Sequence, residues 1–217
     1  MTERVLGIDV SGPGGGAALV HPDGLLVETI PPAIRRGRDL VPRIERMLKT
    51  AGLGPADLDL IACGVGPGSF TGIRIGIATA ATLAYAARVP VMDVGSLHGI
   101  AANAPTDAEH VLVALDARRG HVFAGRFRRG ALEGAYRNVE PAELATELAA
   151  DTWVLGDARE AFPEVFGRFP GTSDAPVRPD AIARLGAARF AQGERTRPDQ
   201  LRPLYLRLSD PEIRRMM

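Results

Sequence analysis

The chain has 217 residues, of which 46% are hydrophobic and 24% charged, as expected for a folded protein with a sizeable core. Its 26 basic residues balance its 26 acidic residues, which excludes a protein that wraps nucleic acid through an overall positive field. The single cysteine, Cys63, excludes an internal disulfide and fits a reducing compartment.

The first predicted elements are three short strands. Residues 4–10 read RVLGIDV, a buried strand that stops at a glycine-rich turn. Residues 17–20 and 25–30 follow as two strands joined by His-Pro-Asp-Gly, a strong turn signal. A helix is predicted over 38–50, because Leu40, Ile44 and Leu48 recur on one face. Next come a strand over 58–63, a long helix that ends near residue 87, a strand over 89–94 and a short helix over 97–103.

The pattern then restarts. Residues 111–116 read VLVALD and parallel the VLGID that ends at Asp9. It continues with two strands near 121–127 and 131–139, a helix over 141–150 and a strand over 152–155. After Gly156 the second copy degenerates, with one more helix near 180–191.

A strand–strand–strand–helix–strand order that occurs twice predicts an α/β protein of the actin/hexokinase (ASKHA) type. In that fold, antiparallel hairpins extend a sheet whose remaining strands are joined by helical crossovers. We expect two lobes, residues 1–107 and a degenerate second lobe of residues 108–217. The alternative is a generic α/β protein in which the repetition is accidental.

A glycine-rich turn, Gly64-Val-Gly-Pro-Gly-Ser-Phe-Thr, follows the strand 58–63. It is not a Walker A loop, because no lysine follows, and Ser69 replaces the third glycine of a dinucleotide fingerprint. Its backbone N–H groups could hold an anion, or the turn could simply start a helix. The residues of a degenerate nucleotide or anion loop would be Asp9, Ser11, Gly68, Ser69, Thr71 and Asp116. Without a phosphate-binding lysine, Asp9 and Asp116 are interpreted mainly as residues that fix turns.

The helix after this turn carries a ridge of small residues, Gly72, Gly76, Ala80 and Ala84, spaced by four. A helical glycine costs about 1 kcal/mol relative to alanine, so the ridge predicts a neighbour that comes close. That neighbour is either the chain's own core or a helix of another subunit. The predicted partner interface comprises Gly72, Ile73, Gly76, Ile77, Ala80, Ala84, Arg43 and Met47.

The longest apolar stretch, 73–87, belongs to this helix and is too short for a bilayer of about 30 Å. The chain does not open on a basic segment followed by an apolar run, which is the pattern of a signal peptide. We therefore expect a soluble, cytoplasmic protein without membrane contact.

The block Gly66-Pro-Gly-Ser-Phe-Thr-Gly-Ile-Arg-Ile-Gly resembles the signature of the bacterial TsaB (YeaZ) family. Further matches are Ile8-Asp9, Asp116-Ala-Arg-Arg-Gly and Pro203-Leu-Tyr-Leu-Arg, in the family's order over almost the whole chain. The chain departs from the family at three places: Arg36 stands where the family often has histidine, the turn over 12–16 lacks a second carboxylate, and His121 and Phe123 replace Glu and Tyr.

The resemblance implies a two-lobed actin/hexokinase fold and a role in forming threonylcarbamoyladenosine beside the anticodon of tRNAs that read ANN codons. It implies a non-catalytic heterodimer partner of a TsaD-like subunit, which would carry the ATP or ADP and the metal. This chain would then bind no cofactor of its own. A TsaE-like ATPase would join the complex, and tRNA would be reached through it. In the family the first two long helices, here 38–50 and 71–87, build a helical bundle with the partner. Alone, the same surface could form a homodimer.

A catalytic role has little support in the residues. The four histidines, His21, His98, His110 and His121, are far apart and form no HxxxH or HExxH motif, so no metal site and no catalytic residue is predicted. The alternative function is a free-standing ATP-dependent kinase or carbamoyltransferase of the same fold. The basic residues Arg202, Arg207, Arg214 and Arg215 form either a solvated tail or a contact with tRNA phosphates.

Overall fold

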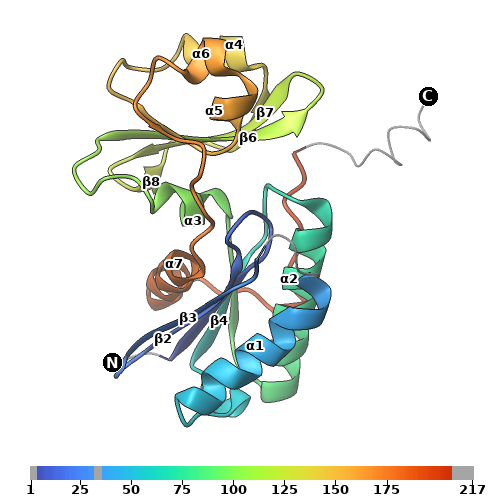
Figure 1. Ribbon diagram of the computed structural model, residues 1–217. Helices are drawn as coiled ribbons and strands as arrows, with labels where there is room; N and C mark the ends of the chain where they lie inside the picture. Colours follow the sequence, from blue (N-terminus) through green and yellow to red (C-terminus); the bar gives the residue numbers. More distant parts are fainter. Residues whose placement is uncertain (1–3, 32–35, 207–217) are drawn as a thin grey trace. The chain divides into compact units, whose positions relative to one another are not determined.

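The computed structural model describes residues 4–31 and 36–206, without the side chains of residues 36–38 (Figure 1). The side chain of Arg36 and the residues Arg207, Arg214 and Arg215 therefore lie outside the described part. The chain divides into two units, residues 1–99 with 176–203 and residues 100–175 with 204–217.

The first unit is built on a five-stranded mixed sheet of order β3-β2-β1-β4-β5. β1 lies at its centre, antiparallel to β2 and parallel to β4, and every residue of β1 and β4 is buried. The strands match the predicted ones closely; they are β1 Val5–Asp9, β2 Gly16–His21, β3 Gly24–Thr29, β4 Leu60–Gly64 and β5 Val91–Val94.

Helices cover both faces of this sheet. Figure 1 shows α1 (Arg36–Thr50) and α2 (Phe70–Ala87) on one face and α7 (Pro179–Ala191) on the other. α1 carries the predicted apolar face, with Leu40, Ile44 and Leu48 buried. The short elements are η1 (Pro55–Asp57), η2 (Pro198–Gln200) and α3 (Leu97–Ala101), within which the first unit ends at Gly99 and the second begins at Ile100.

α7 belongs to the first unit although it lies far along the chain. Ile182 and Ala183 pack into the same apolar cluster as Leu60 and Met92 of the sheet. Gly7 permits this approach, because a side chain there would overlap the carbonyl oxygen of Pro179. The predicted division into 1–107 and 108–217 thus differs from the observed one, since residues 176–203 return to the first sheet.

An ion pair at the start of α7 should contribute to this docking. Asp180 is buried, and its carboxylate accepts hydrogen bonds of 3.2 and 2.6 Å from the half-exposed guanidinium of Arg178. Burial raises the pKa of Asp180, but the hydrogen bonds and charge of Arg178 outweigh it, and the pKa is lowered. The ion pair therefore stabilises the fold at pH values above about 4, the pKa of this carboxyl group in the unfolded chain. The stabilisation is lost as the pH falls through the lowered pKa of the folded state.

We therefore expect Asp180→Asn to lower the free energy of unfolding by about 1–2 kcal/mol at pH 7, the range of a charge-assisted hydrogen bond with a partly solvated partner. The difference from the wild type should shrink as the pH is lowered towards 3. Urea unfolding at a series of pH values measures it, and a difference that is constant with pH would contradict the assignment.

The second unit contains a sheet of order β11-β10-β6-β7-β8, with β9 also paired to β7. Its apolar cluster includes Leu112, Val122, Val154 and Phe166. The predicted strand 131–139 is two short strands, because Gly134 turns the chain with a φ of 74°. The predicted helix 141–150 ends at Ala145. The elements are β6 His110–Arg118, β7 His121–Arg128, β8 Ala131–Leu132, β9 Arg137–Val139, α4 Pro141–Ala145, β10 Trp153–Leu155, α5 Ala158–Ala161, α6 Pro163–Phe166 and β11 Gly171–Thr172.

The two units repeat one topology. β1, β2, β3, α1 and β4 in the first correspond to β6, β7, β8 with β9, α4 and β10 in the second. β6, like β1, lies between an antiparallel and a parallel neighbour. The second copy is reduced, since α4 has five residues where α1 has 15. This duplicated order confirms the predicted actin/hexokinase-type fold.

Candidate functional site

The glycine turn between β4 and α2 is closed by the end of β1. Asp9 is fully buried, and its carboxylate Oδ1 accepts the N–H of Ser11 at 2.8 Å. The other carboxylate oxygen lies so close to Gly64 that a side chain there would overlap it. Asp9 therefore fixes the turn after β1 and packs against the strand beside it.

Residues 10 and 11 fill the space in front of the glycines. The Ser11 carbonyl oxygen accepts the N–H of Ser69 at 2.7 Å, and Ser69 caps α2 by accepting the N–H of Gly72 at 3.3 Å. A side chain on Gly72 would overlap the carbonyl oxygen of Val10. The N–H groups of Ser69 and Gly72 thus bond within the chain, which favours a close-packed turn over an open anion cradle.

The structure brings four of the six predicted loop residues together: Asp9, Ser11, Gly68 and Ser69. A side chain on Gly68 would lie 2.8 Å from the Ser11 carbonyl oxygen, and its φ of 157° also suits glycine. Thr71 lies exposed in the first turn of α2. The sixth, Asp116, belongs to the second unit.

Asp116 makes the same turn in the second unit that Asp9 makes in the first. Its Oδ1 accepts the N–H of Arg118 at 2.8 Å, and the Arg118 guanidinium lies 3.0 Å from its carboxylate. The Asp116 N–H donates to Asp157 at 2.8 Å. Burial raises the pKa of Asp157, and the charge of Asp116 raises it further, though less strongly. The hydrogen bonds that Asp157 accepts act in the opposite direction but do not cancel this rise. Sequence reasoning missed Asp157, although it too follows a strand end.

Two further titratable side chains, Cys63 and His98, have pKa values shifted by burial. Burial raises the pKa of the Cys63 thiol well above its usual value, helped by the charges of Asp9 and Asp93, so the thiol stays protonated. Burial lowers the pKa of His98, whose Nδ1 lies 3.2 Å from the Gly95 carbonyl oxygen. Within residues 4–31 and 36–206, no three His, Cys, Asp or Glu side chains come close enough to hold a metal ion.

The glycine–alanine ridge of α2 faces the chain's own sheet. Gly72, Ile73, Gly76, Ala80 and Ala84 are the buried residues of the helix. The sequence left two possible neighbours for this ridge, the chain's own core and a helix of another subunit. In the structure the ridge packs on the core.

This corrects the predicted partner interface. Five of its eight members form the buried side of α2, and Met47 of α1 is 2% exposed. Arg43 donates to Glu28 at 2.9 Å, and Ile77 is half-buried. A partner cannot reach most of these side chains without displacing the core.

The exposed side of α2 carries a different set of side chains, which we call the outer face: Phe70, Arg74, Ala78, Thr82 and Tyr85. Tyr85 is 82% exposed, and the Arg74 guanidinium lies 3.9 Å from the centre of the Phe70 ring. Arg74 is the one charged residue in the sequence 70–87. Exposed Val41 of α1 adds apolar surface on the same side of the sheet.

By length and composition alone, α2 is also the one helix of the described part that could cross a membrane, with a mean hydropathy of 1.2 over 18 residues, 28% of them buried. Core helices pass the same test, and the buried ridge of α2 packs on the sheet. Exposed apolar surface bounded by aromatic residues is typical of protein interfaces. The outer face is therefore the stronger candidate for a contact with another protein.

Known proteins resemble this chain over most of its length. Residues 35–143 match the family model described as TsaD, tRNA N6-adenosine threonylcarbamoyltransferase. The tRNA threonylcarbamoyladenosine biosynthesis protein TsaB of Bacillus subtilis (strain 168) is 31% identical, over 97% of this chain and 96% of that protein. TsaB of Escherichia coli (strain K12) is 30% identical, over 77% and 79%. The solved structure of YeaZ from Pseudomonas aeruginosa superposes with a TM-score of 0.83 at 29% identity, covering 94% of this chain and 100% of that one.

Proposed function

Because the chain belongs to the TsaB family of tRNA threonylcarbamoyladenosine biosynthesis proteins, we propose that it acts in this modification as the non-catalytic partner of a TsaD-like subunit. The two would form a heterodimer, with α1 and α2 of this chain in the contact. The tRNA and a TsaE-like ATPase would meet the chain within the larger complex.

The outer face of α2 is the observation that carries this proposal. Its aromatic ends and its single arginine are residue types enriched at the energetic centres of interfaces. Between them, Ala78 and Thr82 are small enough for a partner helix to approach closely. Burying exposed apolar side chains such as Tyr85 and Val41 supplies the driving force for association.

The geometry of the glycine turn supports the view that the nucleotide and the metal bind the TsaD-like subunit and not this chain. In this chain the Asp9 carboxylate is buried and bonded to Ser11, and residues 10–11 occupy the space in front of the glycines. A phosphate group at that place would have to displace the chain's own backbone.

A mixing experiment tests the proposal. The purified chain and a purified TsaD-like subunit are assayed separately and together for elution volume and for modification of tRNA supplied with threonylcarbamoyl-adenylate. We expect a heterodimer and modified tRNA only when both are present. ATP turnover by the isolated chain at ordinary enzymatic rates would contradict the proposal and favour the kinase or carbamoyltransferase.

A further inference from the structure

The second unit contains a cavity of about 550 Å³ that the proposed function does not use. It lies between the segment that leads from α3 into β6 and the turn that joins β7 to β8, and all of its lining residues belong to the second unit. Sites for small molecules have volumes of about 300–1,000 Å³, so the cavity is large enough for such a ligand.

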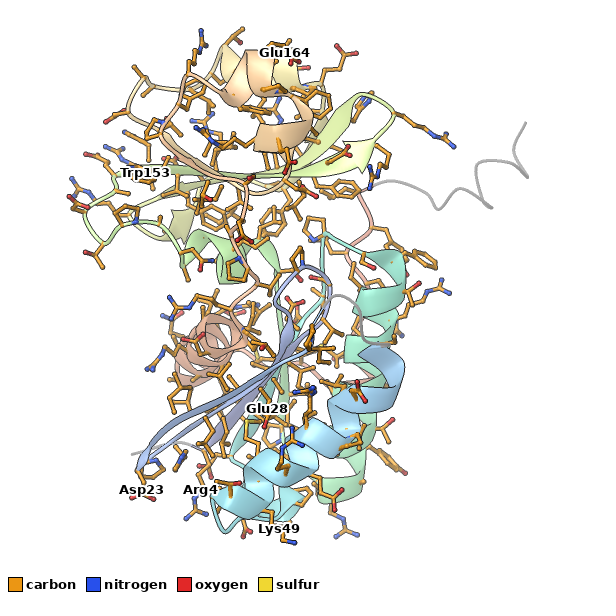
Figure 2. All side chains as sticks on the ribbon, viewed as in Figure 1. Arg4, Asp23, Glu28, Lys49, Trp153 and Glu164 are labelled. Carbon is orange, nitrogen blue, oxygen red and sulfur yellow. The ribbon has the colours of Figure 1, made fainter. Side chains whose placement is uncertain are left out.

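The floor of the cavity is apolar. Val111 of β6 and Phe127 of β7 line it, lie opposite each other in the sheet and are 5% and 1% exposed. Side chains alternate between the two faces of a strand, and the neighbouring Leu112 packs under the helices of this unit. Glu164 marks the helical side of the sheet in Figure 2. Val111 and Phe127 therefore line the face that α4 to α6 do not cover.

Hydrogen bonds hold the walls of the cavity. The N–H of Ala108 donates to the carbonyl oxygen of Pro105 at 3.1 Å, and the N–H of Arg129 donates to that of Glu109 at 2.9 Å. The Glu109 carboxylate also accepts hydrogen bonds of 3.2 and 2.8 Å from Arg128. The hydrogen bond of Arg128, and then the charge of Arg129, lower the pKa of Glu109. The cavity is thus preformed, and Glu109 is already ionised and paired at neutral pH.

Two charged groups on the lining keep unused capacity to bind a ligand. In the described part of the chain, the exposed carboxylate of Asp107 forms no ion pair and no hydrogen bond. The side chain of Arg129 is 77% exposed, and its guanidinium lies 3.6 Å from the Glu109 carboxylate, which is beyond hydrogen-bond distance. Asp107 and Arg129 are not paired with each other either. One cavity therefore presents an anion and a cation beside an apolar floor.

We infer that this cavity binds a free α-amino acid with an apolar side chain. The ammonium group of the ligand would meet Asp107, and its carboxylate would accept hydrogen bonds from Arg129, whose planar guanidinium suits a carboxylate. The apolar side chain would lie on Val111 and Phe127, where burial supplies part of the affinity. The inference goes beyond the proposed function and uses no residue of the outer face of α2.

A free amino acid is assigned because it carries both charges on neighbouring atoms. The end residue of a peptide carries only one of them, the ammonium at the N-terminus or the carboxylate at the C-terminus. Such a ligand would leave either Asp107 or Arg129 without a partner, and specificity follows from that loss.

NMR titration of the ¹⁵N-labelled full chain tests the class of ligand with three probes: L-leucine, leucinamide, which lacks the carboxylate, and N-acetyl-leucine, which lacks the ammonium. We expect leucine to cause saturable shifts of the amide signals of residues 104–109 and 127–130. Leucinamide and N-acetyl-leucine should each bind about tenfold more weakly, because each lacks one charge-assisted hydrogen bond. The inference is overturned if leucine causes no saturable shift up to its solubility limit, or if the three probes bind alike.

Matched variants test the two side chains. Asp107→Asn should weaken leucine binding about tenfold and leave N-acetyl-leucine unchanged, whereas Arg129→Asn should weaken leucine equally and leave leucinamide unchanged. Asn suits the left-handed backbone of Arg129, whose φ is 49°, so this variant should stay folded. The controls are Asp151→Asn, at an exposed position outside the cavity, and Arg119→Asn, in the turn between β6 and β7 with a φ of 58°.

Both controls should bind all three probes as the wild type does. A loss of leucine binding in the controls equal to that in Asp107→Asn and Arg129→Asn would contradict the assignment. So would leucine binding that neither of those two variants changes.

Discussion

Replacing Gly72 with alanine should lower the free energy of unfolding by about 3 kcal/mol or more, at the upper end of overpacking in a closed site. The added methyl group would overlap the carbonyl oxygen of Val10 and would also lie 3.1 Å from the Cα of Ser11. Both neighbours are backbone atoms that hold the turn after β1, so neither can move without disturbing the Ser11–Ser69 hydrogen bond.

Gly76→Ala is the matched control one turn further along the same ridge. Its methyl group would meet the Val10 side chain at 3.6 Å, an ordinary van der Waals contact. Alanine is the better helix former by about 1 kcal/mol, so this variant should be as stable as the wild type or more stable. Urea unfolding of both variants measures the difference, and similar midpoints would show that the ridge does not pack as described.

Ala78→Arg should strongly weaken the contact with a TsaD-like subunit while the chain stays folded. Ala78 is exposed at the middle of the outer face, one turn from Arg74. A long cation there would hold a partner helix away and place two like charges on adjacent turns. We expect the affinity for the partner to fall by about 100-fold, or 2.7 kcal/mol, and tRNA modification to fall with it.

Ala188→Arg is the control for this variant, because Ala188 is exposed on α7, which covers the other face of the sheet. It should leave the complex unchanged. Isothermal titration of the TsaD-like subunit with each variant, together with thermal unfolding of the isolated chains, separates lost binding from lost stability. Binding by Ala78→Arg at wild-type affinity would show that the partner contacts another surface.

Most of the fold could be predicted because its signals are local. The turn His-Pro-Asp-Gly at residues 21–24 defines the β2–β3 hairpin, and the repetition of VLGID as VLVALD indicates the duplication. The position of α7 could not be predicted, because an apolar helix face does not say which sheet it covers. That choice depends on Gly7 meeting Pro179, a contact between residues at opposite ends of the sequence.

The orientation of α2 could not be predicted for a similar reason. Gly72, Gly76, Ala80 and Ala84 are small residues spaced by four, but so are Ala78, Thr82 and Ala86 on the opposite side. Spacing alone cannot tell the side that faces the core from the side that faces outward. Burial in the structure distinguishes them, and it moves the predicted contact from the first set to the second.

The return of α7 to the first sheet has a consequence for synthesis on the ribosome. A nascent chain that has emerged only as far as residue 175 has made all five strands of that sheet but lacks the helix that covers one face. Val5, Leu60 and Met92 would stay in water until the last part of the message is translated. Truncation before residue 179 should therefore yield a product that aggregates or is degraded, and the first unit cannot be cut out as one continuous fragment.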